Sequence, residues 1–245
     1  MLTDDPFADF RSGLEDPEKR RRLLQLLTGG ALGLAPWSGA NAFFWDSSPQ
    51  KLPEGRSIHS LEGEVSVNGS RADENTRIRA GDIVRTGAGG EIVFAVGADA
   101  FLLRSGSELE ISGSDFFVDS LRILTGRLLS VFARRKPDQQ LSLRAATATI
   151  GIRGTGVYVE SEPDQTYVCT CYGQAALASN ADPDDRELIT SKNHDQPRYI
   201  RRDPGGDGRI REAPVINHDN SELKLLEAIV GRDVPAGFGK QSYQK

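Results

Sequence analysis

The chain is poor in cysteine, histidine and aromatic residues. Its 245 residues include only two cysteines, Cys169 and Cys171, and three histidines, and aromatic side chains make up 7% of the sequence. Two cysteines cannot build the disulfide framework that holds many small secreted domains together. Hydrophobic residues make up 38%, which is enough for a folded chain with a modest core.

The sequence also lacks an excess of basic residues and the common catalytic motifs. It carries 30 lysines and arginines against 35 acidic residues, a net charge of -5. A protein that binds nucleic acid needs a basic face to displace counterions from the phosphates, so we expect no nucleic-acid partner. No G-x-S-x-G, G-x-x-x-x-G-K-[ST] or H-E-x-x-H motif occurs. These absences favour a binding module over an enzyme.

The N-terminus predicts a targeting segment. Arg20, Arg21 and Arg22 precede an apolar run of about 13 residues, 23–35, and Ala40 and Ala42 frame a small-residue cleavage pattern. A spanning helix needs about 20 residues, so we predict a signal peptide over 1–42, a periplasmic mature protein and no membrane span in it. The arginines resemble a twin-arginine signal, and the general route stays open. The alternative is a membrane-anchored regulator that keeps this helix.

Residues 57–179 show the pattern of a β-rich domain, after a linker at 43–56. Apolar residues alternate with polar ones over short runs, and glycine-rich turns separate these runs at intervals of roughly 8 to 12 residues. Three segments resemble one another weakly, and in each a glycine (Gly63, Gly126 and Gly173) allows a bend beside a strand. The sequence therefore predicts a mainly β fold, which is a sandwich, a barrel or a stacked β-solenoid, with no long helix.

Composition changes after Ser179. Residues 180–245 predict a loop-rich extension with one amphipathic helix at about 220–231, for which Asp219 or Asn220 is a suitable N-cap. Leu226, Ile229 and Val230 recur at helical spacing, so we expect the helix to pack on the edge of the β domain rather than to bind a partner.

Several segments of the β-rich region carry a family resemblance. They are 61–65 (Leu-Glu-Gly-Glu-Val), 79–87 (Arg-Ala-Gly-Asp-Ile-Val-Arg-Thr-Gly), 148–159 around Ile-Arg-Gly-Thr, and 166–173. The chain resembles the FecR-domain family over about 55–179. The resemblance implies an extracytoplasmic β-fold that senses a signal or contacts another envelope protein. Only about twenty residues precede Arg22, so direct control of a sigma factor is not expected, and the family does not account for the region after Asn180.

The family-like motif is Arg153, Gly154, Thr155 and Gly156. Its simpler interpretation is structural: the glycines permit a bend or a close backbone approach, and Arg153 pairs with a carboxylate. The alternative is that the Arg153 guanidinium organises a polar cluster that a partner recognises.

The Cys-x-Cys pair is the candidate metal site. Residues two apart on a strand point to the same face, so Cys169 and Cys171 present their thiols side by side, about 6.5 Å apart along an extended strand. That geometry does not suit a disulfide. With His194 and His218 from C-terminal loops, the pair forms a Cys₂His₂ set that suits zinc or, with open positions, iron or haem. The alternative is two buried small residues or a redox dithiol.

These observations leave three hypotheses. The first is a non-enzymatic periplasmic binding, scaffold or signalling module with an envelope protein as its partner. The second is a metal- or haem-binding redox or sensor protein. The third is the anchored regulator. For the second hypothesis we expect the segment after Asn180 to fold back and bring His194 or His218 to the two sulfurs, within roughly 4–5 Å.

Overall fold

The computed structural model describes residues 50–136, 139 and 141–239, which belong to one compact unit. Arg20, Arg21, Arg22, Ala40 and Ala42 of the predicted signal, and the first residues of the predicted linker, lie outside the described residues. Among the residues that are described, no helix is both long enough and apolar enough to cross a bilayer.

The fold is mainly β, as predicted, and its strands form two sheets. Sheet A runs in the order β1 (Ile58–Glu62), β5 (Glu91–Val96), β6 (Asp99–Leu103), β8 (Phe117–Val131), β11 (Gly156–Ser161), β12 (Gln165–Ser179), β14 (Arg198–Arg201) and β15 (Ile210–Glu212). Sheet B runs in the order β3 (Ser70–Arg71), β2 (Val65–Val67), β4 (Ile83–Thr86), β7 (Glu108–Ser114), β8, β9 (Leu141–Arg144), β10 (Ala148–Ile152), β12 and β13 (Arg186–Ser191). Neighbouring strands are antiparallel except β8 and β9, which are parallel.

Two long strands, β8 and β12, belong to both sheets. The first half of β8 pairs in sheet B and its second half in sheet A, whereas β12 begins in sheet A and ends in sheet B. Each strand changes sheet near a glycine in the left-handed region, Gly126 (φ +96°) and Gly173 (φ +87°). A side-chain carbon at Gly126 would lie 2.0 Å from Oγ of Ser107, so the bend requires glycine there. Two of the three glycines of the weak repeat, Gly126 and Gly173, thus mark bends, whereas Gly63 lies in the turn between β1 and β2.

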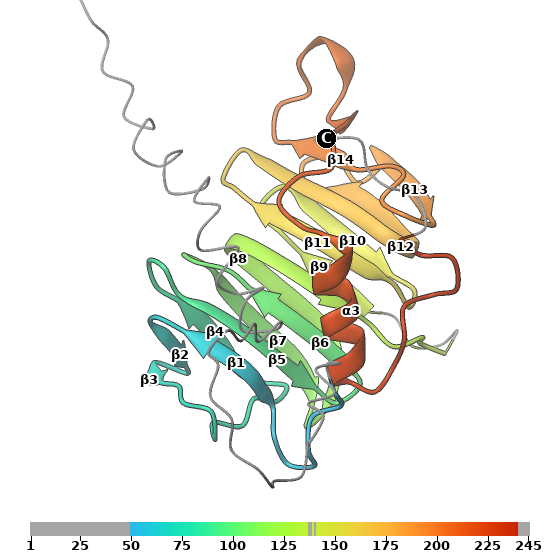
Figure 1. The fold of residues 1–245 in the computed structure, drawn as a ribbon. Coiled ribbons are helices and arrows are strands. Elements are labelled where there is room, and N and C mark those ends of the chain that lie inside the picture. The colour runs from blue at the N-terminus through green and yellow to red at the C-terminus, as the bar shows by residue number, and fades with distance from the viewer. Residues whose placement is uncertain (1–49, 137–138, 140, 240–245) are drawn as a thin grey trace, which may run out of the picture. The chain divides into compact units, whose positions relative to one another are not determined.

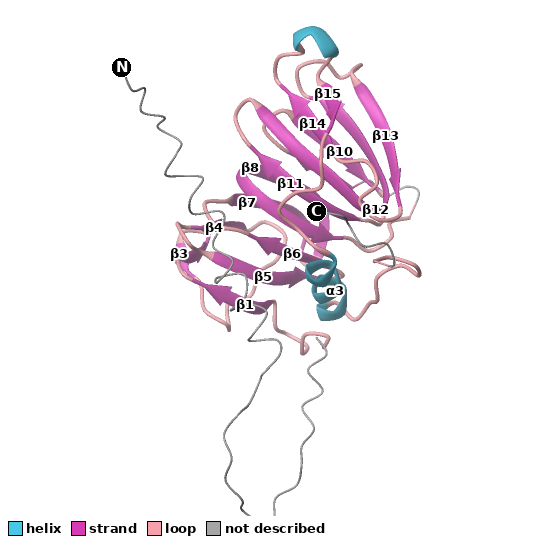
Figure 2. Ribbon diagram, turned by 45° about the horizontal axis from the view of Figure 1, so that its top comes forward, coloured by secondary structure: helices cyan, strands magenta, loops and turns pink. Residues whose placement is uncertain are grey.

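The main hydrophobic core lies between the two sheets. Along β5, Ile92 and Phe94 point into this core, and Ile150 and Leu177 reach it from sheet B. The opposite, outer face of sheet A is also apolar, and the C-terminal part of the chain covers it. Helix α3 (Asn220–Ile229) packs there against β6 and β8 (Figures 1 and 2). The described part of 57–179 contains strands and turns and no α-helix, as predicted.

The segment after Ser179, for which the sequence predicts loops and one helix, also forms three strands. It contributes β13 to the edge of sheet B and β14 and β15 to the edge of sheet A, with one short 3₁₀ turn, η1 (Gly205–Asp207), between β14 and β15. Helix α3 begins after Asp219, which caps it: its carboxylate accepts from the amides of Ser221 and Glu222, and the Glu222 side chain accepts from the Asp219 amide. The predicted N-cap is confirmed.

Replacing Gly154 with valine is expected to destabilise the fold by at least about 1 kcal/mol, because Gly154 has φ +62° and a side-chain carbon there would lie 2.8 Å from Cα of Arg134. Gly89 is the matched control, since its φ is +72° but nothing lies within 4 Å of the added carbon. Urea unfolding of Gly154→Val and Gly89→Val should show the larger loss for Gly154. Equal losses would mean that the contact with Arg134 relaxes freely.

Candidate metal centre

The two cysteines lie side by side on the outer face of sheet A. Both are fully buried and belong to the apolar layer beneath the C-terminal segment, as do Tyr158 and Tyr172. In the pairing of β11 with β12, Tyr158 lies opposite Cys169, and the register shifts so that Cys171 has no opposite residue. Such a β-bulge re-aims side chains, and here it leaves Cys171 and Tyr172, which are consecutive, in the same layer.

His194 comes from the turn that follows β13. This turn is held by Asp195, whose carboxylate accepts from the amide of Lys192 at 2.7 Å, and by Ser191, whose hydroxyl accepts from the Asp195 amide at 3.1 Å. The His194 amide donates to the carbonyl of Cys171 at 2.8 Å, which ties the turn to the cysteine strand. His194 itself has φ +56°. A non-glycine residue in this region is strained and persists where its surroundings hold it.

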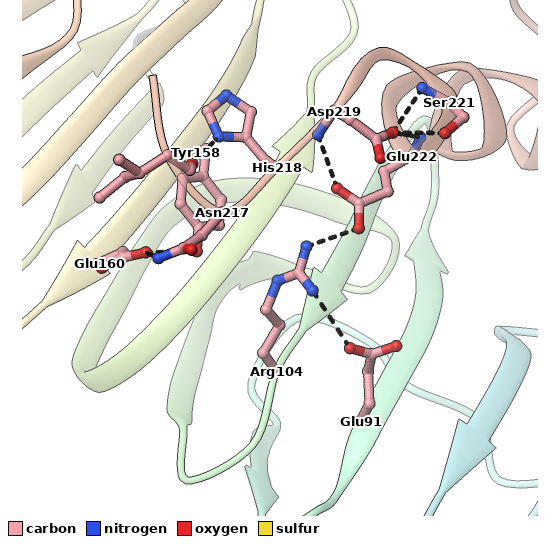
Figure 3. A network of polar contacts seen from close by, with 10 residues as sticks. Glu91, Arg104, Tyr158, Glu160, Asn217, His218, Asp219, Ser221 and Glu222 are labelled. Carbon is pink, nitrogen blue, oxygen red and sulfur yellow. Dashed lines mark hydrogen bonds and ion pairs between the residues drawn. The ribbon is translucent and has the colours of Figure 1, made fainter. Parts of the chain in front are cut away.

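His218 comes from the segment that leads into α3. Its ring stacks on Tyr158, with centroids 4.5 Å apart and planes inclined by 21°. The preceding residue, Asn217, has φ +56° and donates to Glu160 at 2.8 Å, and Glu160 also accepts from the Tyr158 hydroxyl at 2.7 Å (Figure 3). A second tyrosine, Tyr167, donates to the carbonyl of Pro214 at 2.9 Å. The tyrosines of sheet A therefore position this segment over the cysteines.

All four predicted ligands converge. One ligand atom from each of Cys169, Cys171, His194 and His218 lies within 4.8 Å of the other three, and all four residues are buried. Sγ of Cys169 lies 3.4 Å from Nδ1 of His194, which in turn lies 2.8 Å from Nε2 of His218. The expected fold-back of the C-terminal segment onto the cysteine strand is confirmed, and it brings both histidines rather than one. That the four bind a metal ion is a proposal.

The outer nitrogen of each imidazole is held by an oxygen. Nδ1 of His218 lies 2.6 Å from the carbonyl of Ile216, which can only accept, so this nitrogen carries the proton. Nε2 of His194 lies 2.9 Å from Oδ1 of Asn220 and donates to it. In neutral rings the two inner nitrogens then face each other as lone pairs, which repel unless a proton or a metal ion lies between them. Metal-binding histidines are oriented in this way.

The thiols differ in their proton affinity. Burial alone would raise the pKa of Cys169. The hydrogen bond from Cys171, and the hydrogen bonds and charge that the imidazoles of His194 and His218 supply when an inner nitrogen is protonated, outweigh burial and hold this pKa well below its usual value. Burial raises the pKa of Cys171 well above its usual value, and the hydrogen bond to Cys169 and its charge raise it further. The cluster thus favours a thiolate at Cys169, the form that binds metals.

The family-like motif lies beside this site but outside it. Gly154 makes the bend that the sequence predicted, and the buried hydroxyl of Thr155 donates to the carbonyl of Tyr172. A side-chain carbon at Gly156 would lie 2.7 Å from the Tyr172 ring, so glycine permits the close approach. Arg153 is exposed, and the carboxylate pairing expected for it is not found among the described residues.

Some residues around the site gave no sequence signal. Tyr158 and Asn220 orient the histidines, but nothing in their local sequence indicates this role. A separate polar network connects β5, β6 and α3: Arg104 lies 2.7 Å from Glu222 and 3.6 Å from Glu91 (Figure 3). The sequence indicates a role for Glu222 only as a capping residue, because it lies three residues after Asp219.

Comparison with models of known protein families finds no match, and comparison with curated protein sequences finds none either. Among solved structures, two crystal structures of a putative anti-sigma factor from Parabacteroides distasonis ATCC 8503, at 1.65 and 2.50 Å resolution, resemble this chain with 12% sequence identity and a TM-score of 0.43. The match covers 54% of this chain and 58% of the other. The FecR-domain resemblance thus stays a prediction, and the functional proposal rests on the site geometry.

Proposed function

We propose that this chain is a non-enzymatic, extracytoplasmic β-sandwich module that binds one transition metal ion at Cys169, Cys171, His194 and His218. The observation that supports the proposal is the convergence of these four buried ligands, drawn from three separate segments of the chain. Two sulfurs and two nitrogens are the donor set of many closed zinc sites.

Zinc fits the site best. With metal bonds of about 2.3 Å to sulfur and about 2.0 Å to nitrogen, tetrahedral ligands lie roughly 3.3–3.8 Å from one another. The observed 3.4 Å between Cys169 and His194 falls in this range, and the 2.8 Å between the two imidazoles requires only a small shift. The same separations leave no room for a porphyrin plane between two of the ligands, so a haem with two of these residues as opposite axial ligands does not fit. Iron remains the second candidate, since S₂N₂ tetrahedra also suit it.

The site is closed rather than catalytic. Four protein ligands complete a tetrahedron, whereas a catalytic zinc keeps one position for water or substrate. Because the ligands are buried, the metal ion would stabilise the fold or act as its sensor. A partner would bind elsewhere, on the surface of the domain. We infer export from the N-terminal pattern of three arginines, an apolar run and Ala40 and Ala42. In the oxidising periplasm, a bound metal ion would also protect two neighbouring thiols.

Protein purified from the envelope of its native cell should contain one zinc ion per chain. Native mass spectrometry with elemental analysis measures the ion, and denaturing mass spectrometry of the same sample should give a chain that starts at Phe43. The double variant Cys169→Ser/Cys171→Ser should lose the ion. His218→Gln removes one of the proposed ligands, and its matched control is His59→Gln. His59 is the one histidine of the sequence outside the cluster and lies on β1, so its variant should retain the metal.

Two results would contradict this proposal. If the chain from native cells is metal-free and also fails to take up added Zn²⁺ or Co²⁺, the metal proposal is contradicted. The cysteines then have a packing or redox role. A full-length chain that starts at Met1 in the cytoplasmic fraction would remove the export proposal and leave the metal site intact.

A further inference from the structure

We propose that metal occupancy controls the docking of residues 213–238, here called the C-terminal arm, on the outer face of sheet A. This inference rests on the proposed function, because the metal ion is the regulating ligand. The arm contains His218 and α3, and it covers the apolar layer in which Cys169 and Cys171 lie.

The four ligands connect separate parts of the fold. Cys169 and Cys171 belong to β12, and His194 belongs to the turn after β13, which is bonded to the Cys171 carbonyl. Only His218 belongs to the arm. A metal ion at this site therefore joins the arm to the sheet through one coordinate bond, and without the ion this junction depends on hydrogen bonds and ring stacking.

The ligand is continuous with the start of the helix. His218 directly precedes Asp219, which caps α3, and the first helical residue, Asn220, accepts from His194. A helix of 10 residues is marginal by itself and depends on its cap and its packing. Fixing His218 therefore fixes the residue from which the helix starts.

The remaining contacts of the arm divide between its two ends. Near the start of α3, Glu222 pairs with Arg104, which directly follows β6, and Leu223 is buried in the outer layer. At the far end, Glu227 accepts from both Tyr172 and Arg232, and the carbonyl of Ile229 accepts from the amide of Leu52 at 2.9 Å. Both ends thus have attachments of their own, including Asn217 to Glu160 near His218, but only the His218 end would also carry a bond to the metal ion. Loss of the metal ion should therefore loosen the arm from its His218 end.

Hydrogen–deuterium exchange with mass spectrometry tests this on the full chain, loaded with zinc or stripped with a chelator. We assume that zinc binds only while the arm is docked. At a free zinc concentration of about 100 times Kd, amides of 213–224 should then exchange about a hundredfold more slowly than in the stripped protein. Amides of 227–231 should change less. In the stripped protein, amides of 213–224 should exchange faster than those of β5 and β6, because the arm opens while the sandwich stays folded. In His218→Gln, exchange in 213–224 should no longer respond to zinc, whereas His59→Gln should respond as the unaltered chain does.

The outcomes separate this inference from the proposed function. Zinc bound at one ion per chain without slower exchange in 213–224 would overturn control of the arm and leave the site intact. Exchange in the stripped protein that is equally slow in 213–224 and in β5 and β6 would also overturn it, since the arm would then open only when the whole fold unfolds. Failure to bind zinc at all would overturn both. If His218→Gln does not fold, the comparison of loaded and stripped unaltered protein still decides.

Discussion

Removing the metal ion with a chelator is expected to lower the midpoint of thermal unfolding by about 10 °C. A ligand that binds only the folded state at about 1,000 times its Kd stabilises that state by about 4 kcal/mol. For a domain of 150–250 residues, each kcal/mol shifts the midpoint by about 2–4 °C. Differential scanning calorimetry of zinc-loaded and stripped protein measures the shift.

The controls follow from the ligand set. Restoring zinc should restore the midpoint, and magnesium should not, because sulfur and imidazole ligands do not suit a hard cation. Cys169→Ser/Cys171→Ser should unfold at the same temperature with and without chelator, and His59→Gln should keep the full shift. An unchanged midpoint in the stripped protein would show that the four side chains pack equally well without an ion.

The second large effect is expected from Arg135→Met, at about 3–5 kcal/mol of lost stability, because removing one member of a buried ion pair leaves the other charge without compensation. The Arg135 guanidinium lies 2.5 Å from the Asp99 carboxylate, and their side chains are only 7% and 2% exposed. The matched control is Arg122→Met: its pair with Glu110 is 54% and 31% exposed, so its loss should cost less than about 1 kcal/mol. Urea unfolding of both variants measures the difference.

The penalty of Arg135→Met should depend on pH. Burial raises the pKa of Asp99, although the hydrogen bond and the charge of Arg135 lower it. The variant removes this lowering effect, so the pKa of Asp99 should rise further. A carboxyl whose pKa is higher in the folded state binds protons more readily there, so stability falls as the pH rises through that pKa. Arg135→Met should therefore be less destabilised at about pH 4 than at about pH 8. A penalty that is the same at both values would show that Asp99 finds another positive partner.

Sequence reasoning reached the features that depend on local geometry. The period of two along a strand was enough to place Cys169 and Cys171 on one face, and the cap at Asp219 follows from side-chain chemistry within one turn. Gly126 and Gly173 were identified as bends for the same reason. That these bends carry β8 and β12 from one sheet to the other could not be predicted, because it depends on pairing between distant strands.

The candidate metal site likewise combines local features, which the sequence predicts, with tertiary features, which it does not. The sequence offered His194 and His218 as ligands only because the chain has few histidines, and the return of both loops to β12 is a tertiary property. The strand β13 was missed although Leu188 and Ile189 lie within it, because charged turn residues flank it. The carboxylate pairing expected for Arg153 depended on a distant residue, and the described residues do not provide it.

The position of the ligands along the chain determines when the site can be assembled. The cysteines follow residue 168, and His218 comes after every strand of both sheets, so a growing chain cannot enclose an ion until the sandwich strands have been synthesised. If the site binds a metal ion as proposed, it therefore does so late in biogenesis. On the twin-arginine route, which carries folded proteins, the ion would come from the cytoplasm, whereas on the general route it would come from the periplasm. If export and metal binding both hold, the export route would thus decide which cell compartment supplies the ion.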